Sequence, residues 1–168
     1  MTKEIDLNAL FSARRWAKRR TPAGERMVRF RWAEEHGAVW VFSAGLVSWQ
    51  GLASRAAESR WQVPKMPAPV PFSFWLATAA RQDVWRSLKG VPTLMPVIRV
   101  TSDAEARSVS VMLGAVMDPK RASPAIEGVL EDMFQPRRIN AWTEWAVRNC
   151  RAQRRGPAPA PAPAASKG

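Results

Sequence analysis

Apolar residues alternate with arginines between Val28 and Trp32, which is the two-residue period of a half-buried strand. Residues 34–37 follow as a predicted turn, and Gly37 suits a positive φ angle there. The apolar run 38–43 then predicts a return strand, so the pattern indicates a β-hairpin.

The rest of the chain alternates between helical and extended patterns. Gly and Pro residues mark most of the boundaries between them. The spacing predicts helices over 6–20, 49–61, 73–88, from Ser123-Pro124 to Pro136, and 139–155, a polyproline-like connector over 63–72, and strands over 94–101 and 107–116. The second of these strands also fits a helix, because Ala, Met and Leu are abundant in it.

These elements predict a small α+β fold. We expect a mixed or antiparallel sheet of four to five short strands with helices packed on it. Residues 1–155 form one predicted basic domain, because 168 residues fit a single core. Residues 156–168, rich in Pro and Ala, predict a disordered C-terminal tail.

The charge balance is strongly positive, with 26 Lys and Arg against 14 Asp and Glu, a net charge of +12. A potential of this sign favours nucleic acid, an acidic protein or an anionic membrane as partner. The charge is uneven, because residues 101–136 are net acidic between basic flanks. This distribution predicts a sided molecule.

The hairpin offers the most specific candidate site. With a four-residue turn, Arg31 lies opposite Trp40 and Arg29 opposite Phe42, close enough for each guanidinium to lie along a ring. An exposed sheet face of this kind would stack bases and meet phosphates of a single strand. The alternative is that Trp40 and Phe42 are buried under a helix while the arginines reach its edge.

Two basic helices complete the candidate nucleic-acid-binding surface. The cations of the first helix are Arg14, Arg15, Lys18, Arg19 and Arg20. Those of the last helix are Arg148, Arg151, Arg154 and Arg155, whose spacing predicts one ridge that follows a phosphate backbone. Solvated helix faces are the alternative interpretation, and no recognised nucleic-acid-binding motif is present.

Nine tryptophans and no tyrosine make Trp the only large ring with a polar group. We expect Trp142 and Trp145 to pack into the core from one helix face. Trp49, Trp61, Trp75 and Trp85 are predicted to be core or packing residues as well. A partner surface is the alternative for some of them.

Catalysis finds little support in the sequence. His36 is the only histidine and lies in the predicted turn, and Cys150 is the only cysteine, so a Ser-His or Cys-His arrangement lacks partners. One His and one Cys do not build a metal site, and no phosphate or dinucleotide loop is present, so no cofactor and no metal are expected. An acidic face is the preferred interpretation of Glu127, Glu131 and Asp132.

The sequence therefore favours a non-enzymatic nucleic-acid-binding accessory protein. The first alternative is a protein–protein interaction module or inhibitor that docks on a nucleic-acid-handling or secretion/conjugation machine. The second is a membrane-anchored component that spans the bilayer at 38–54, although a buried strand followed by a helix start fits that segment better. A single cysteine and the absence of a signal-peptide pattern favour the cytoplasm.

Overall fold

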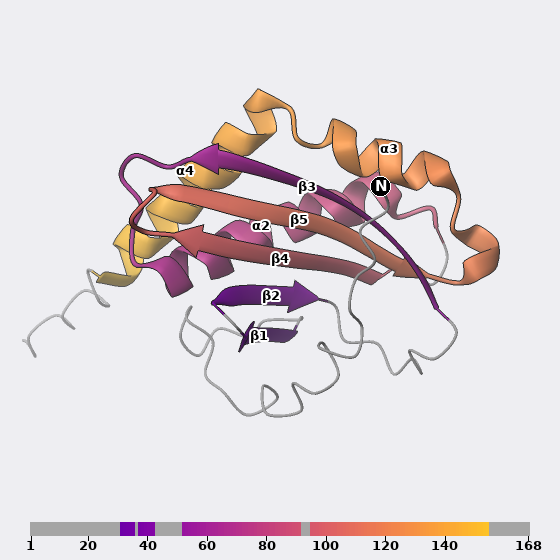
Figure 1. The fold of residues 1–168 in the computed structure, drawn as a ribbon, viewed down its shortest axis with the longest axis horizontal. Helices are drawn as coiled ribbons and strands as arrows, with labels where there is room; N and C mark the ends of the chain where they lie inside the picture. Colours follow the sequence, from indigo (N-terminus) through magenta and orange to yellow (C-terminus); the bar gives the residue numbers. More distant parts are fainter. Residues whose placement is uncertain (1–30, 36, 43–51, 92–94, 155–168) are drawn as a thin grey trace, which may run out of the picture.

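A five-stranded antiparallel sheet with helices packed on it forms the protein (Figure 1). The computed structural model describes residues 31–35, 37–42, 52–91 and 95–154. Along the chain the elements are β1 (Arg31–Glu35), β2 (Ala38–Phe42), β3 (Ala53–Gln62), α2 (Pro69–Leu88), β4 (Met95–Asp103), β5 (Ser108–Met117), the 3₁₀ helix η2 (Pro119–Arg121), α3 (Pro124–Asp132) and α4 (Pro136–Arg154). The predicted α+β class is confirmed.

The strand order is β1-β2-β4-β5-β3, and every neighbouring pair is antiparallel. Two hairpins, β1–β2 and β4–β5, are joined through the β2–β4 pair, and β3 closes the other edge against β5. β3 and β5 are ten residues each, the length of the strand predicted over 107–116. The longest strands of the sheet are therefore β4, β5 and β3.

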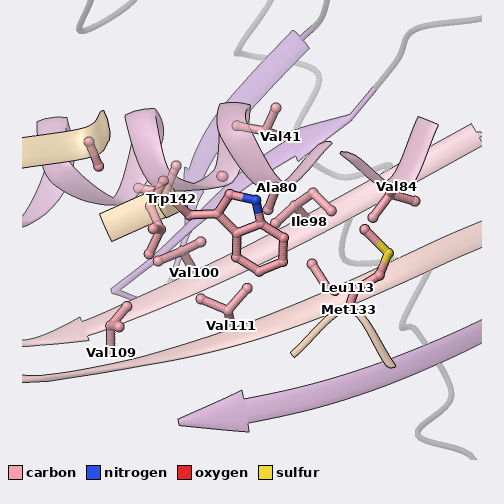
Figure 2. Packing of buried hydrophobic residues seen from close by; sticks show 14 of the residues in the cluster. Val41, Ala80, Val84, Ile98, Val100, Val109, Val111, Leu113, Met133 and Trp142 are labelled. Atoms are coloured by element: carbon pink, nitrogen blue, oxygen red, sulfur yellow. The ribbon is translucent and has the colours of Figure 1, made fainter. Parts of the chain in front are cut away.

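The main core lies between the sheet and the helices. Val39, Ile98, Val100, Val111 and Leu113 project from the strands toward the helices and are almost fully buried. Figure 2 shows the Trp142 indole of α4 lying among side chains from β4 and β5. Because successive residues of a strand point to opposite faces, this set covers only one side of the sheet.

The other side of the sheet carries a second, smaller apolar cluster. Its buried members are Ala38, Trp40, Phe42, Ala56, Met95, Val97, Met112 and Val116, and Leu52 packs against them. α2 and α4 belong to the first cluster and lie on the opposite face (Figure 1). The two faces of the sheet thus differ in what packs on them.

α2 and α4 are held together by polar and aromatic contacts. Trp142 Nε1 donates to Asp83 Oδ2 at 2.8 Å, and the rings of Trp75 and Trp145 meet edge to face at 5.2 Å between centroids. Trp61 at the end of β3 donates through Nε1 to Thr143 Oγ1 at 3.1 Å. The bonds of Trp142 and Trp61 use the indole N–H while the ring is packed, whereas Trp75 Nε1 is buried and has no hydrogen-bond partner among the described residues.

The first correction concerns the segment that was predicted to be a helix over 49–61. Ala53–Gln62 is strand β3, paired with β5 along its whole length, and residues 49–51 lie outside the described part. Ala, Arg and Glu favour a helix locally, but the long β5 strand supplies a pairing edge that overrides this weak preference.

The second correction concerns prolines. Residues 63–72 were predicted to be extended, yet α2 begins at Pro69 and contains Pro71 in its first turn. α4 likewise begins at Pro136, not at 139, and α3 ends at Asp132 before reaching it. Proline has no N–H to lose at the first helical turn, so it starts these helices rather than preventing or ending them.

Other boundaries agree with the sequence. β4 and β5 match the two predicted strands within two residues, with the turn at 104–107, and Ser123 caps α3 by accepting from Ala125 N at 3.2 Å. The predicted helix over 6–20 and the tail over 156–168 lie outside the described residues.

The segment 38–54, considered as a possible span, contributes β2 and the first residues of β3, while 43–51 lie outside the description. Ala38–Phe42 is a buried strand, as preferred, but residues 53–54 are extended and do not begin a helix. None of the helices in the described ranges combines the length and apolar character that a bilayer crossing requires.

Candidate nucleic-acid interface

The hairpin forms with a shorter turn than predicted. β1 continues to Glu35 and β2 starts at Ala38, which leaves residues 36–37 as the connection, with Gly37 at φ 73°. Arg31 is consequently paired with Phe42, and Ala33 with Trp40, a shift of two residues from the predicted pairing. Two-residue hairpin loops favour positive φ, which glycine adopts without strain. Arg29 lies outside the described residues.

The rings of β2 are buried. Trp40 is 8% exposed and Phe42 is 2% exposed, so neither presents a free face of the kind the predicted platform needs. The cation on Trp40 is Arg99 of β4, whose Cζ lies 5.5 Å from the ring centroid. Arg99 also pairs with Glu58 of β3 at 3.4 Å. The arginine–tryptophan contact therefore joins three strands within the sheet.

The last helix presents its arginines to solvent. Trp142, Ala146 and Cys150 form the buried face of α4, and Arg148 and Arg151 are exposed. α4 lies on the helix-covered face of the sheet, whereas Trp40 and Phe42 belong to the other face. The structure thus does not bring Arg148 and Arg151 together with Trp40 and Phe42.

A different set of cations gathers at one end of the molecule, which we call the basic end. Figure 1 shows the β4–β5 turn, the end of β3, the start of α2 and the last turns of α4 at this end. The exposed cations on these segments are Arg60, Lys65, Arg107, Arg148 and Arg151. Four separate parts of the chain contribute to it.

Two of these arginines are held in place by the fold. Arg60 donates from Nε and Nη2 to the buried Ser108 Oγ at 3.1 and 2.7 Å, yet its side chain is 59% exposed. Arg107 has a φ of 47°, in the left-handed region, and its carbonyl accepts from Val63 N at 2.7 Å. This bond ties the β4–β5 turn to the segment that carries Lys65.

Acidic groups reduce but do not cancel the charge of the basic end. Asp103, Glu105 and Glu144 are exposed in the same region. Asp103 lies 3.9 Å from Arg60, and its Oδ1 accepts from Ala106 N within the turn. Exposed pairs of this kind contribute little energy, so Arg60 keeps most of its capacity to bind an anion.

The opposite end carries the acidic side chains of η2 and α3, and we call it the acidic end. These side chains are Asp118, Glu127, Glu131 and Asp132. Cations lie there as well: Lys120, Arg121, Arg55, whose Nη2 donates to Ala122 O at 2.9 Å, and Arg86 and Lys89 at the end of α2. β5 separates the two ends by its ten residues, about 30 Å.

The remaining predicted residues fall outside the description. Arg14, Arg15, Lys18, Arg19, Arg20 and Arg155 are not among the described residues, and Arg154 is the last residue of α4, with its side chain undescribed. Their contribution to an interface stays a prediction.

Sequence reasoning missed Arg60, Lys65 and Arg107 because it searched for runs of cations. These three are isolated in the sequence, and Arg60 lay in a segment predicted as helix. The usable signal was the strand pairing itself, since antiparallel strands bring the turn after one strand to the end of its neighbour.

Trp85 was also misjudged. It was predicted to pack in the core, but it is 48% exposed on the last turns of α2. Trp61, Trp75, Trp142 and Trp145, in contrast, pack as predicted.

The described residues give no support to a metal centre. They contain no group of three or more His, Cys, Asp or Glu side chains that fits a metal ion. Cys150 is 5% exposed on the inner face of α4. At the basic end, the guanidinium of Arg60 is held by Ser108, and guanidinium groups suit anionic oxygens.

No family model, curated protein or solved structure matches this chain.

Proposed function

We propose that this protein binds nucleic acid without a catalytic role, through phosphate contacts at the basic end. The observation that carries the proposal is that the end of β3, the β3–α2 connection, the β4–β5 turn and the last turns of α4 lie at one end of the molecule and that each carries an exposed cation. Arginine and lysine that neutralise phosphates release condensed counterions, which drives binding without base contacts.

The arrangement favours phosphates over a base-reading contact. Arg60 is fixed on Ser108, and Arg148 and Arg151 stand one turn apart on α4. Phosphate contacts position a strand but carry no sequence information. We therefore infer that binding depends on salt and shows little sequence preference.

The test measures affinity by fluorescence anisotropy for labelled single strands and duplexes over a series of salt concentrations. Replacing both Arg148→Gln and Arg151→Gln is expected to weaken binding about tenfold and to lower the slope of log K against log salt by roughly 1 to 2. Each phosphate contact that is lost lowers the number of counterions released on binding by slightly less than one.

The matched control is Lys120→Gln with Arg121→Gln, the same charge change at the acidic end. This variant is expected to bind as the native protein does, within about twofold, because its side chains lie beyond the screening length from the basic end. Equal losses in both variants would reveal a general charge effect, and an absence of salt-dependent binding in the native protein would refute the proposal.

A further inference from the structure

The exposed indole of Trp85 is the largest apolar group that the described surface presents. Trp85 is 48% exposed, and Val129 is the other large apolar residue that is exposed. Every other described tryptophan whose exposure is known is buried or half-buried. Folding does not use the outer half of this ring, which leaves it available for a partner.

Cations surround the ring on the last turns of α2. Lys89 follows Trp85 by four residues and Arg86 by one, and both are exposed. Residues four apart on a helix have Cβ atoms about 5–6 Å apart, so the Lys89 ammonium stands one turn beyond the indole. Gln82, one turn before Trp85, is exposed as well and adds a neutral hydrogen-bonding group.

Negative charge is directed elsewhere on this helix. Asp83 faces α4, where its Oδ2 accepts from Trp142 Nε1, and its Oδ1 lies 3.6 Å from Arg86 Nη1. Arg81 lies one turn before Trp85 and is half-buried, and burial lowers the pKa of its guanidinium. The outward surface around Trp85 is therefore cationic and neutral, without an exposed acid on α2.

A structural explanation accounts for the cations alone. Positive side chains at the C-terminal end of a helix interact favourably with its dipole, and Arg86 and Lys89 satisfy that preference. The helix dipole does not explain why a half-exposed indole stands beside these two cations, since a smaller or polar residue at position 85 would serve the helix equally well. The ring and the cations together call for an anionic partner with a flat apolar face.

We propose that Trp85, with Arg86 and Lys89, is a stacking site for a base of single-stranded nucleic acid. The indole would stack on the base while the two cations, which both follow it on α2, meet the neighbouring phosphates, a combination that tolerates any base. The stacking site rests on the proposed function. It adds a preference for single-stranded nucleic acid, because the bases of a duplex have no free face.

The experiment compares Trp85→Ala with Trp85→Phe. Anisotropy titrations use labelled oligothymidylate, a duplex of equal length and labelled poly-glutamate as an acidic polypeptide. We expect Trp85→Ala to lose about tenfold in affinity for oligothymidylate with duplex affinity unchanged, and Trp85→Phe to keep most of it because it retains a ring.

Val129→Ala serves as the matched control, since it truncates the other exposed apolar side chain on the acidic α3. It should leave all affinities unchanged. Thermal melts of each variant check that the fold is kept. We expect it to be kept because Trp85 and Val129 are both exposed.

Two results would overturn the stacking site alone. If Trp85→Ala bound oligothymidylate as tightly as the native protein does, the basic end would be the whole interface. A loss confined to poly-glutamate would assign Trp85 to an acidic protein partner. If the native protein bound neither nucleic acid, the stacking site and the proposed function would both fail, so the failures remain distinguishable.

Discussion

At the scale of single residues, the indole N–H groups organise the helix layer. Trp142 is 3% exposed and donates to Asp83, while Trp61 donates to Thr143, so two bonds fix α4 against α2 and β3. A hydrogen bond to a charged carboxylate contributes more than one between neutral groups. Asp83 thus holds α4 in place and leaves the outer surface of α2 without an exposed acid.

Replacing Trp142→Phe removes this donor and part of the buried ring. We expect the free energy of unfolding to fall by about 2–3 kcal/mol, because a buried ring is truncated and Asp83 Oδ2 loses its hydrogen bond, although Asp83 keeps its ion pair with Arg86. Urea denaturation measures the change. Trp85→Phe is the control, and its half-exposed position predicts a change below about 0.5 kcal/mol. Similar losses in both variants would contradict the role given to the Trp142–Asp83 bond.

At the scale of elements, the helix starts follow local chemistry closely. Ser123 has an extended backbone and accepts from Ala125 N, with Pro124 in the first turn and Glu127 behind it. The Ser123 side chain gives the N–H of Ala125 a hydrogen-bond partner that it would otherwise lack. The negative charge of Glu127 interacts favourably with the positive end of the helix dipole.

Ser123→Ala should lower the free energy of unfolding by about 1 kcal/mol, because the side-chain acceptor is lost. Ser123→Asp should preserve it, since a carboxylate caps equally well. Chemical denaturation of both variants gives the comparison. An unchanged free energy of unfolding in the Ala variant would show that the cap contributes nothing here.

The sequence predicted these local features better than the long-range ones. The Gly37 turn, the β4–β5 hairpin and the Ser123 cap depend on residues close in the chain, and all three are present. β3 was mistaken for a helix because its partner β5 lies far along the chain and no local residue reveals it.

The candidate site followed the same rule. Alternation correctly placed Trp40 and Phe42 on one face of their strand, but whether that face is exposed depends on what packs against it, and both rings are buried. Strand pairing brings the end of β3 and the β4–β5 turn to the end of the molecule where α4 finishes, so the isolated cations Arg60 and Arg107 could not be assigned to one surface from the sequence. On α2, Trp75 packs against Trp145 of α4, whereas Trp85 is 48% exposed.

At the scale of the whole molecule, the acidic side chains of α3 and the exposed arginines on the last turns of α4 lie at opposite ends. Exposed cations also lie at the α3 end, among them Lys120 and Arg86, so the sidedness of the whole chain stays a prediction. Charges about 30 Å apart interact only when salt is dilute, because the screening length is about 8 Å at physiological ionic strength and about 30 Å at 0.01 M.

Neutralising the acidic end tests this separation. Glu127→Gln, Glu131→Gln and Asp132→Asn combined should leave nucleic-acid affinity unchanged at about 0.15 M salt and raise it severalfold at about 0.01 M. Anisotropy titrations at the two salt concentrations measure it. A gain of the same size at both concentrations would mean that nucleic acid contacts α3 directly.

The position of β3 in the sheet also bears on how the chain folds. β3 precedes β4 and β5 in the chain but pairs only with β5, from Ala53 with Met117 to Gln62 with Ser108. Its docking must close a long loop that contains all of α2, whereas β4 and β5 close a four-residue turn. Loop closure of this kind slows folding. The β4–β5 hairpin should therefore form first, and the edge strand should dock late.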